Sequence, residues 1–278
     1  MSQPFSGGNA LALDHLTATD ATPSQLVELA AETGCRAVCL FLEQMDLLPL
    51  MPPFTLLGRS AEARETKARM SALGVELDLA YPFTLSARAK ADDFRPSLEA
   101  AAWLGVKAVN VLHYDREPER RFESFAAFSA LAGSLGLRVV LEFYPPSQVK
   151  SLAGALALVS RLNQPEQAGV NVDLLHLMRS GATLAELRAA PADFVHYAQY
   201  CDGLLPGPAP GLSLDAEAGT GRLLPGDGGF DLAGFANALP RGTKASVELP
   251  RDEAARSGES KSARARRAVE MTARILSF

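Results

Sequence analysis

The sequence lacks several features on which common functions depend. It has only three cysteines (Cys35, Cys39 and Cys201), whose spacing fits neither a metal site nor a redox pair, so we expect reduced thiols in a cytoplasmic protein. No apolar run approaches the ~20 residues of a membrane span. Residues 1–9 do not show the basic and apolar regions of a secretory signal. We therefore expect no association with a membrane.

Basic residues are also in deficit. The chain carries 27 Lys and Arg against 32 Asp and Glu, a formal net charge of −5. Binding to nucleic acid phosphates needs a basic face, so we expect no nucleic acid partner. The sequence contains no G-x-x-x-x-G-K-[ST] phosphate loop and no G-x-S-x-G nucleophile turn, and its Gly219-Thr220-Gly221 does not follow a strand as a dinucleotide site requires.

What is present is a repeated pattern of short apolar runs separated by helical stretches. Several runs lack strict alternation of apolar and polar residues, as expected of parallel strands buried on both faces. Gly34, Gly74, Gly105 and Gly136 each stand between a helical stretch and the next run, where glycine ends helices. The runs cover residues 10–16, 37–42, 75–81, 106–112, 137–143, 169–173, 194–201 and 244–249.

This pattern predicts an α/β protein, a single (β/α)₈ TIM barrel over residues 1–278. An open doubly wound sheet is the alternative, but the first run is not followed by the usual glycine-rich turn. Thr22, Pro23 and Gln25 predict the start of the first helix, and the last helix is expected over residues 261–276. The Gly- and Pro-rich residues 203–229 form the one long irregular segment, predicted to be a functional loop.

Four acceptor-bearing side chains stand at the ends of the last four predicted strands: Glu142, Asp173, Gln199 and Glu248. In a barrel these ends meet at the mouth where active sites lie. Three carboxylates brought together without a cation raise one another's pKa values, and a divalent metal removes this cost. Oxygen ligands favour Mg²⁺ or Mn²⁺ and leave Zn²⁺ and Co²⁺ open. Taken singly, each residue can equally be a helix cap or an ion-pair partner.

Five segments carry a resemblance to a known family. They are L-E-F-Y-P at 141–145, V-D-L-L-H at 172–176, A-Q-Y-C-D at 198–202, R-L-L-P-G-D-G at 222–228 and S-V-E-L-P at 246–250. Together they resemble the sugar isomerase/epimerase superfamily with a xylose-isomerase-like barrel. The resemblance implies that Glu142, Asp173, Gln199 and Glu248 hold one divalent metal ion (Mn, Mg, Zn or Co). Gln199 stands where many members have histidine, which leaves the substrate open.

The resemblance implies a small-molecule polyol or keto-acid as substrate. Glu142 and Glu248 are the expected catalytic pair, removing and returning a proton next to a metal-polarised carbonyl through an enediolate. An isomerase or epimerase of a sugar or related hydroxy-ketone is the leading interpretation. A lyase that uses the same first step, an inosose-type or 3-dehydroshikimate-type dehydratase, is the alternative. Family members are often dimers or tetramers, so a homo-oligomer is expected by analogy.

Further residues are candidates for substrate binding. The D-x-x-H pattern implies that His176 faces the substrate oxygens, and Arg222 is a candidate partner for a substrate carboxylate or phosphate. Asp202 is expected to bind a substrate hydroxyl or orient a neighbour, and His113 is placed near a strand end, although either histidine can also be structural. His196 has the opposite parity to Gln199 and should face the helices.

Two other functions fit this type of barrel less well. An apurinic-endonuclease-like phosphodiesterase needs a cluster of zinc ions and several histidine ligands, whereas this chain has four histidines in all and is acidic. A non-catalytic binding barrel would be expected to lose Glu142 or Glu248, and both are kept.

Overall fold

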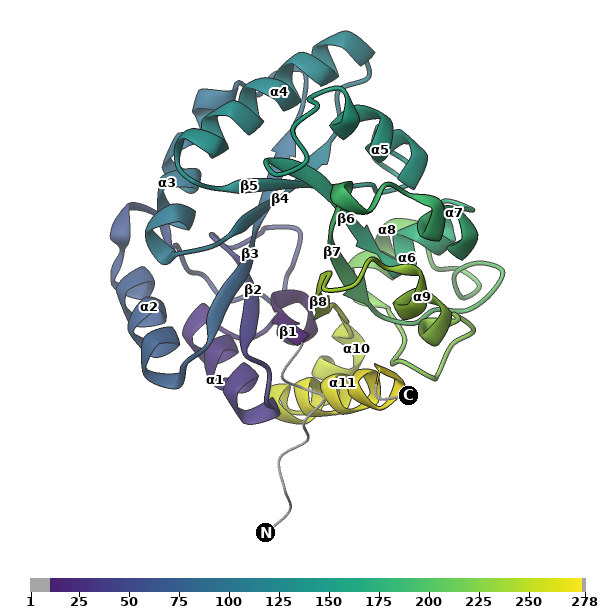
Figure 1. Cartoon of the computed structure of the whole chain (residues 1–278). Helices are drawn as coiled ribbons and strands as arrows, with labels where there is room; N and C mark the ends of the chain where they lie inside the picture. Colours follow the sequence, from purple (N-terminus) through teal and green to yellow (C-terminus); the bar gives the residue numbers. More distant parts are fainter. Residues whose placement is uncertain (1–10, 277–278) are drawn as a thin grey trace.

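Eight parallel strands close into a barrel in sequence order, and helices surround it (Figure 1). The computed structural model describes residues 11–276; residues 1–10, which include the first residue of the first predicted strand, and 277–278 lie outside the described residues. The strands are β1 (Leu11–Asp14), β2 (Ala37–Phe41), β3 (Glu76–Leu85), β4 (Ala108–His113), β5 (Arg138–Glu142), β6 (Ala168–Asp173), β7 (Val195–Tyr200) and β8 (Lys244–Val247). The predicted (β/α)₈ barrel is confirmed, and the open-sheet alternative is wrong because β1 pairs with β8.

Helices follow the strands and pack on the outside of the barrel. The α-helices are α1 (Pro23–Thr33), α2 (Ala61–Leu73), α3 (Arg95–Leu104), α4 (Pro118–Ser134), α5 (Leu152–Ser160), α6 (Leu174–Arg179), α7 (Leu184–Ala189), α8 (Leu214–Thr220), α9 (Leu232–Ala238), α10 (Asp252–Arg256) and α11 (Lys261–Leu276). Four short 3₁₀ turns among residues 11–276 complete the connections: η2 (His15–Ala18), η3 (Leu57–Arg59), η4 (Ala91–Phe94) and η5 (Ala192–Phe194).

The predicted helix signals are confirmed at both ends of α1. Thr22 Oγ1 accepts a hydrogen bond from the Gln25 amide, and Gln25 Oε1 accepts one from the Thr22 amide, which forms a capping box. Gly34 ends the helix with φ of +79°, a left-handed conformation that glycine adopts without strain. Gly74 and Gly105 end α2 and α3 in the same way.

Two segments differ from their predicted form. Strand β3 continues to Leu85, past the predicted end at residue 81, because the pairing with β4 shifts register between Ala80 and Phe83 and so accommodates Pro82, which has no N–H to donate. Residues 203–229 are not wholly irregular, because α8 lies within them. Ser213 caps this helix by accepting a hydrogen bond from the Ala216 amide, 3.1 Å away.

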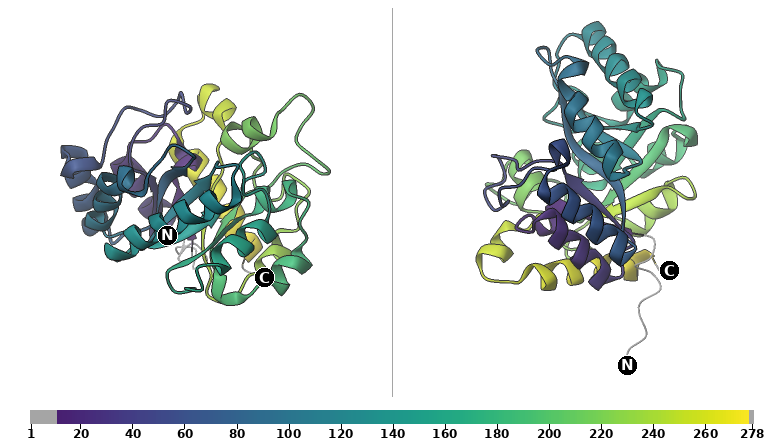
Figure 2. Two further views of the ribbon diagram at one scale, coloured as in Figure 1. Left: turned by 90° about the horizontal axis from the view of Figure 1, so that it is seen from above. Right: turned by 90° about the vertical axis from the view of Figure 1, so that its left-hand side faces the viewer.

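The last helix closes the ring of helices. Helix α11 has the predicted bounds and lies against α1 and α9 (Figure 2). Ala268 is buried on its inner face, and Met271 and Ile275 pack against the core from the edge, at the helical spacing the sequence shows. Within residues 11–276, the structure contains no helix with the length and apolar character to cross a membrane.

Candidate active site

The four predicted ligands lie buried at one end of the barrel. Glu142 and Asp173 are the last residues of β5 and β6, Gln199 is the penultimate residue of β7, and Glu248 directly follows β8. All four are less than a tenth exposed. Because the strands are parallel, these positions share the carboxyl end of the barrel, where the loops that build binding sites begin.

A compact group of Glu142, Asp173 and His176 lies at this end. One ligand atom from each lies within 4.8 Å of the other two. His176 Nε2 is 3.2 Å from Glu142 Oε1, and His176 Nδ1 is 3.9 Å from Asp173 Oδ1. The sequence analysis gave His176 a substrate-binding role, and the structure places it beside two predicted metal ligands.

Local geometry explains how His176 reaches this position. Helix α6 begins immediately after β6, and Asp173 caps it by accepting a hydrogen bond from the His176 amide at 3.0 Å. The same aspartate is therefore a strand end, a helix cap and a candidate ligand. The ring of Tyr144 packs on the His176 ring, with centroids 4.7 Å apart, and limits its movement.

Arg222 lies between two of the predicted ligands. Its Nη1 is 2.5 Å from Asp173 Oδ2, its Nη2 is 2.9 Å from Glu248 Oε1, and its Nε donates to the Ala218 carbonyl at 3.0 Å. The side chain is 2% exposed. The predicted partner for a substrate anion is thus a buried cation whose three nitrogens already donate within the protein. Its loop folds back into the barrel mouth, which the sequence did not show.

A row of side-chain amides connects the cluster across neighbouring strands. Asn171 Nδ2 donates to Gln199 Oε1 at 2.6 Å and lies 3.1 Å from Asn110 Oδ1. Asn110 in turn donates to Glu142, and Gln199 donates to Glu248. These bonds fix the orientation of both predicted catalytic carboxylates. Asn110 and Asn171 were not among the predicted site residues, although Asn171 lies two residues before Asp173 and so shares its face of β6.

Burial determines the electrostatics of the carboxylates. Burial raises the pKa of Glu248 well above its ordinary value, and the charges of Asp14, Asp173 and Glu142 add to the rise while Arg222 opposes it. Burial also disfavours the ionised form of Asp173, but Arg222 and His176 outweigh it and hold its pKa below the ordinary value. Asp173 is therefore a fixed anion, whereas Glu248 readily takes up a proton.

Asp14, which the sequence analysis did not single out, joins this group. It is the last residue of β1 and is completely buried. Its Oδ1 accepts hydrogen bonds from the Tyr81 hydroxyl and from the Leu16 amide. Burial raises the pKa of Asp14 to about 7, against the lowering effect of these two bonds and of Arg222. The first strand was predicted to run to residue 16, whereas β1 ends at Asp14 and η2 follows it, so the sequence did not mark Asp14 as a strand end.

The residues present fit a divalent cation. Three carboxyl groups, those of Glu142, Asp173 and Glu248, accompany the single guanidinium of Arg222 among the proposed ligands. The excess of carboxylate oxygens, with one imidazole beside them, is a donor set suited to Mn²⁺, Mg²⁺, Zn²⁺ or Co²⁺. The buried Oδ1 of Asn171 also has no hydrogen-bond partner within residues 11–276.

The structure does not bring Asp202 and His113 into the cluster. The Asp202 carboxylate accepts hydrogen bonds from four backbone amides, those of Gly203, Gly226, Gly228 and Phe230, so it organises the loop instead of facing a substrate. His113 Nε2 lies 3.0 Å from the Arg121 carbonyl oxygen, and its Nδ1 accepts from the Asp115 amide. Both ring nitrogens thus have partners in α4 and the loop before it, and the role of His113 in substrate binding stays a prediction.

The loop that contains α8 is anchored over this end of the barrel. Arg179 at the end of α6 and Glu217 in α8 form a buried two-pronged ion pair, with N···O distances of 2.7 and 2.6 Å. The Tyr144 hydroxyl donates to Asp215 at 2.5 Å. These bonds connect the α8 segment to the residues that flank Asp173 and His176.

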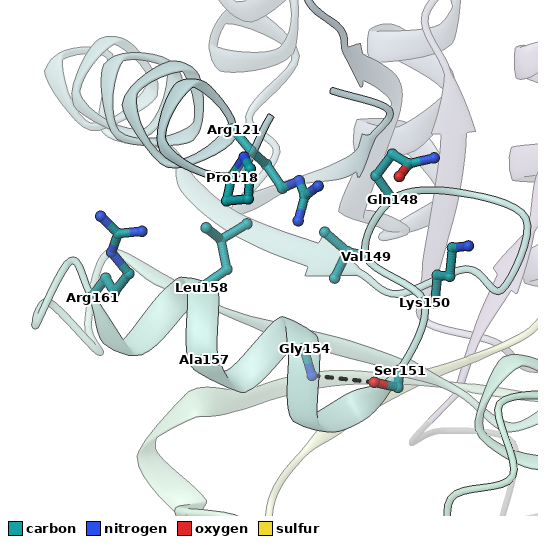
Figure 3. Close-up of a pocket in the computed structure, with 10 residues that line it drawn as sticks. All are labelled: Pro118, Arg121, Gln148, Val149, Lys150, Ser151, Gly154, Ala157, Leu158 and Arg161. Carbon is teal, nitrogen blue, oxygen red and sulfur yellow. Dashed lines mark hydrogen bonds between the residues drawn. The ribbon is translucent and has the colours of Figure 1, made fainter. Parts of the chain in front are cut away.

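A separate groove of about 420 Å³ lies on the outside of the barrel, between the start of α4 and α5 (Figure 3). Arg121, Lys150 and Arg161 supply its basic side chains. Arg161 is paired with Glu119 at 2.7 Å, and Arg121 donates to backbone carbonyls of its own loop. None of the predicted site residues lines the groove.

Comparisons with known proteins agree with this architecture. The crystal structure of IolI protein with a bound zinc atom has a TM-score of 0.77 at 20% identity, over 96% of this chain and 98% of that chain. The probable 3-DHS dehydratase AsbF from Bacillus anthracis, involved in petrobactin synthesis, has a TM-score of 0.70 at 14% identity, over 94% and 97%. An L-ribulose 3-epimerase has a TM-score of 0.67 at 13% identity, over 97% and 95%. At these identities the likeness concerns the fold.

No curated protein matches the chain in sequence. A family model described as xylose isomerase-like TIM barrel matches residues 27–275. This range contains β2 to β8 and every predicted ligand of the candidate site. The chain therefore belongs to the xylose isomerase-like TIM barrel family.

Proposed function

We propose that the protein is a divalent-metal-dependent isomerase or epimerase that acts on a sugar or a related hydroxy-ketone. The observation that carries the proposal is the buried cluster in which Glu142, Asp173 and His176 converge, with Glu248 connected to Asp173 through Arg222. Such a cluster is costly to bury, so a site of this kind is typical of function.

Glu142, Asp173, Gln199 and Glu248 are the proposed metal ligands, and His176 stands beside the first two. When bound, the ion would supply the positive charge that polarises a substrate carbonyl and stabilises negative charge on its oxygen. Asp173 is suited to a permanent ligand because Arg222 keeps it ionised.

Glu248 is the proposed base. Its pKa is raised by burial, so its carboxylate is a stronger proton acceptor than one in water, and it takes the proton from the carbon next to the carbonyl. Arg222 donates to Glu248 Oε1 and Gln199 donates to Glu248 Oε2, and together these bonds fix the orientation of the carboxylate. After the transfer, Glu248 is neutral and the substrate carries the electron pair of the broken C–H bond.

Glu142 is the proposed partner of Glu248 in returning the proton. Asn110 holds its Oε2, and His176 Nε2 lies 3.2 Å from its Oε1, in place to donate to a substrate oxygen. Return of the proton from Glu248 to the neighbouring carbon, while the hydroxyl proton of that carbon passes to the former carbonyl oxygen, gives an isomer. Donation of a proton by protonated Glu142 to the opposite face of the same carbon, with the first proton kept on Glu248, gives an epimer.

A dehydratase is the second candidate. Glu248 in its protonated form can donate to a departing β-hydroxyl, and burial favours that form. The fold similarity to the probable 3-DHS dehydratase is consistent with this outcome.

Metal analysis tests the proposal. We expect about one Mn or Zn ion per chain after loading and dialysis, and loss of the ion in Asp173→Asn, because one ligand carboxylate is then neutral. Asp46→Asn, which changes an exposed aspartate, is the matched control. The ion-loaded and chelator-treated proteins are then assayed with neutral ketoses, inososes and 3-dehydroshikimate. Absence of a bound ion at metal excess, or full activity without it, contradicts the proposal.

A further inference from the structure

Asp14 stands at the mouth of the barrel without a role in the proposed chemistry. Strand β1 pairs with β8 through Leu13 and Val247, so the next residues along the two strands are Asp14 and Glu248. On the other side, Asp14 pairs with Cys39 of β2. The register therefore brings Asp14 to the same end of the barrel as the proposed base.

The two oxygens of Asp14 are in different situations. Oδ1 accepts from the Tyr81 hydroxyl and from the Leu16 amide, which hold the carboxyl group in one orientation. Oδ2 is buried and has no hydrogen-bond partner among residues 11–276. A buried carboxylate oxygen without a partner is unfavourable, and a ligand, ion or water that donates to it removes the cost.

No cation pairs with Asp14 within the described part of the chain, and Arg222 gives its three nitrogens to Asp173, Glu248 and Ala218. A substrate carboxylate or phosphate at this position would place a second acidic group beside the buried Asp14 carboxyl, which is unfavourable in a buried site. A hydroxyl group, in contrast, donates to a carboxylate oxygen in a short, strong hydrogen bond.

We propose that Asp14, oriented by Tyr81, contacts the substrate directly by accepting a hydrogen bond from a hydroxyl of a neutral polyhydroxy-ketone. This inference rests on the proposed function and narrows it, because it selects substrates that carry a hydroxyl at this position over those that carry an acidic group. Tyr81 is a positioning residue, since its hydroxyl acts through Asp14.

The experiment uses the full chain loaded with Mn²⁺ and two kinds of probe. Neutral probes are L-ribulose, D-fructose and an inosose; acidic probes are D-fructose 6-phosphate and 3-dehydroshikimate. Binding is measured by calorimetry, and turnover is assayed in parallel. The proteins compared are wild type, Asp14→Asn, Tyr81→Phe and Asp78→Asn. Asp78 is the matched control because it is also a buried aspartate on a barrel strand, but is paired with Lys244 at the first position of β8.

We expect wild type to bind a neutral probe more tightly than the acidic ones. Asp14→Asn should weaken this binding by about 10- to 100-fold, the effect of losing a charged hydrogen bond. Its metal content should be unchanged. Tyr81→Phe should weaken binding less, and Asp78→Asn should leave it within twofold, a margin of about 0.4 kcal/mol. Where a probe is turned over, KM should rise more than kcat falls.

Binding within twofold of wild type in Asp14→Asn, a wild type that binds no neutral probe, or a preference for the acidic probes would each overturn the inference. The proposed function fails separately. Binding of a neutral probe that depends on Asp14, without turnover of any probe, would support the role of Asp14 and contradict the proposed enzyme activity.

Discussion

Arg222 Nη1 lies 2.5 Å from Asp173 Oδ2, in a pair that is almost completely withdrawn from solvent. The same guanidinium reaches Glu248 with its Nη2. One cation therefore offsets the charge of two proposed metal ligands that come from different strands. The stability of the metal-free protein should depend on this arginine.

Replacement of Arg222 by alanine should destabilise the metal-free protein by about 3–5 kcal/mol, because it leaves Asp173 and Glu248 as uncompensated buried carboxylates. Urea unfolding at neutral pH measures the change. Arg267→Ala, at an arginine that is half exposed, is the control and should cost less than ~1 kcal/mol. A similar small cost for both variants would contradict the role assigned to Arg222.

Glu248→Gln should remove turnover by at least about 100-fold while the fold remains, because the amide cannot accept the substrate proton. Steady-state rates on the ketose that wild type converts, with circular dichroism as the check on folding, test this. Glu253→Gln, an exposed position on α10, should keep wild-type rates. A Glu248→Gln protein with unchanged rates would remove Glu248 from catalysis.

The lowered pKa of His113 predicts that the stability of the protein falls in acid. Burial lowers its pKa to about 4 in the folded protein, against an ordinary value of 6.5. In the unfolded chain His113 therefore binds a proton below pH 6.5, whereas in the folded chain it binds one only below about pH 4. The stability that neutral His113 contributes is complete above pH 6.5 and is lost as the pH falls towards 4. The free energy of unfolding of wild type relative to His113→Gln should drop by about 1 kcal/mol per pH unit across this window. A constant difference between pH 7 and pH 4.5 in urea titrations would contradict it.

Asp202→Ala should loosen the 203–229 loop, because four backbone amides lose their acceptor together. We expect a loss of at least ~2 kcal/mol and faster protease cleavage within this loop. Asp231→Ala is the control, since Asp231 caps only α9. An Asp202→Ala protein that resists cleavage like wild type but has a raised KM would restore the substrate-binding role.

The barrel was predictable because each strand and helix end carries a local signal. Apolar runs, the Thr22 capping box and the glycines after the helices depend on neighbours in sequence, and so does the D-x-x-H turn that places His176. Positions at strand ends were predictable for the same reason, since parallel strands bring their ends together. Asp14 was missed because the first predicted strand ran to residue 16, two residues past the end of β1.

The direction of loop side chains was not predictable. Arg222 was expected to pair with a substrate carboxylate or phosphate but is buried against Asp173, and the His113 ring lies against α4. Both outcomes depend on partners far along the chain or across a loop, which the local pattern does not encode. Metal binding by Glu142, Asp173, Gln199 and Glu248 remains a prediction, and Gln199 and Glu248 bond to each other in the structure.

The cap at the start of α6 has a consequence for how this site can vary. Asp173 and His176 are three positions apart in the chain, and the hydrogen bond between them closes the first turn of α6. Their mutual geometry is therefore inherited from helix geometry and not from the remainder of the barrel. Loops that contact neither residue can lengthen, shorten or change composition without altering this spacing. A single residue inserted at position 174 or 175, in contrast, would rotate the imidazole about 100° around the helix axis and separate the pair.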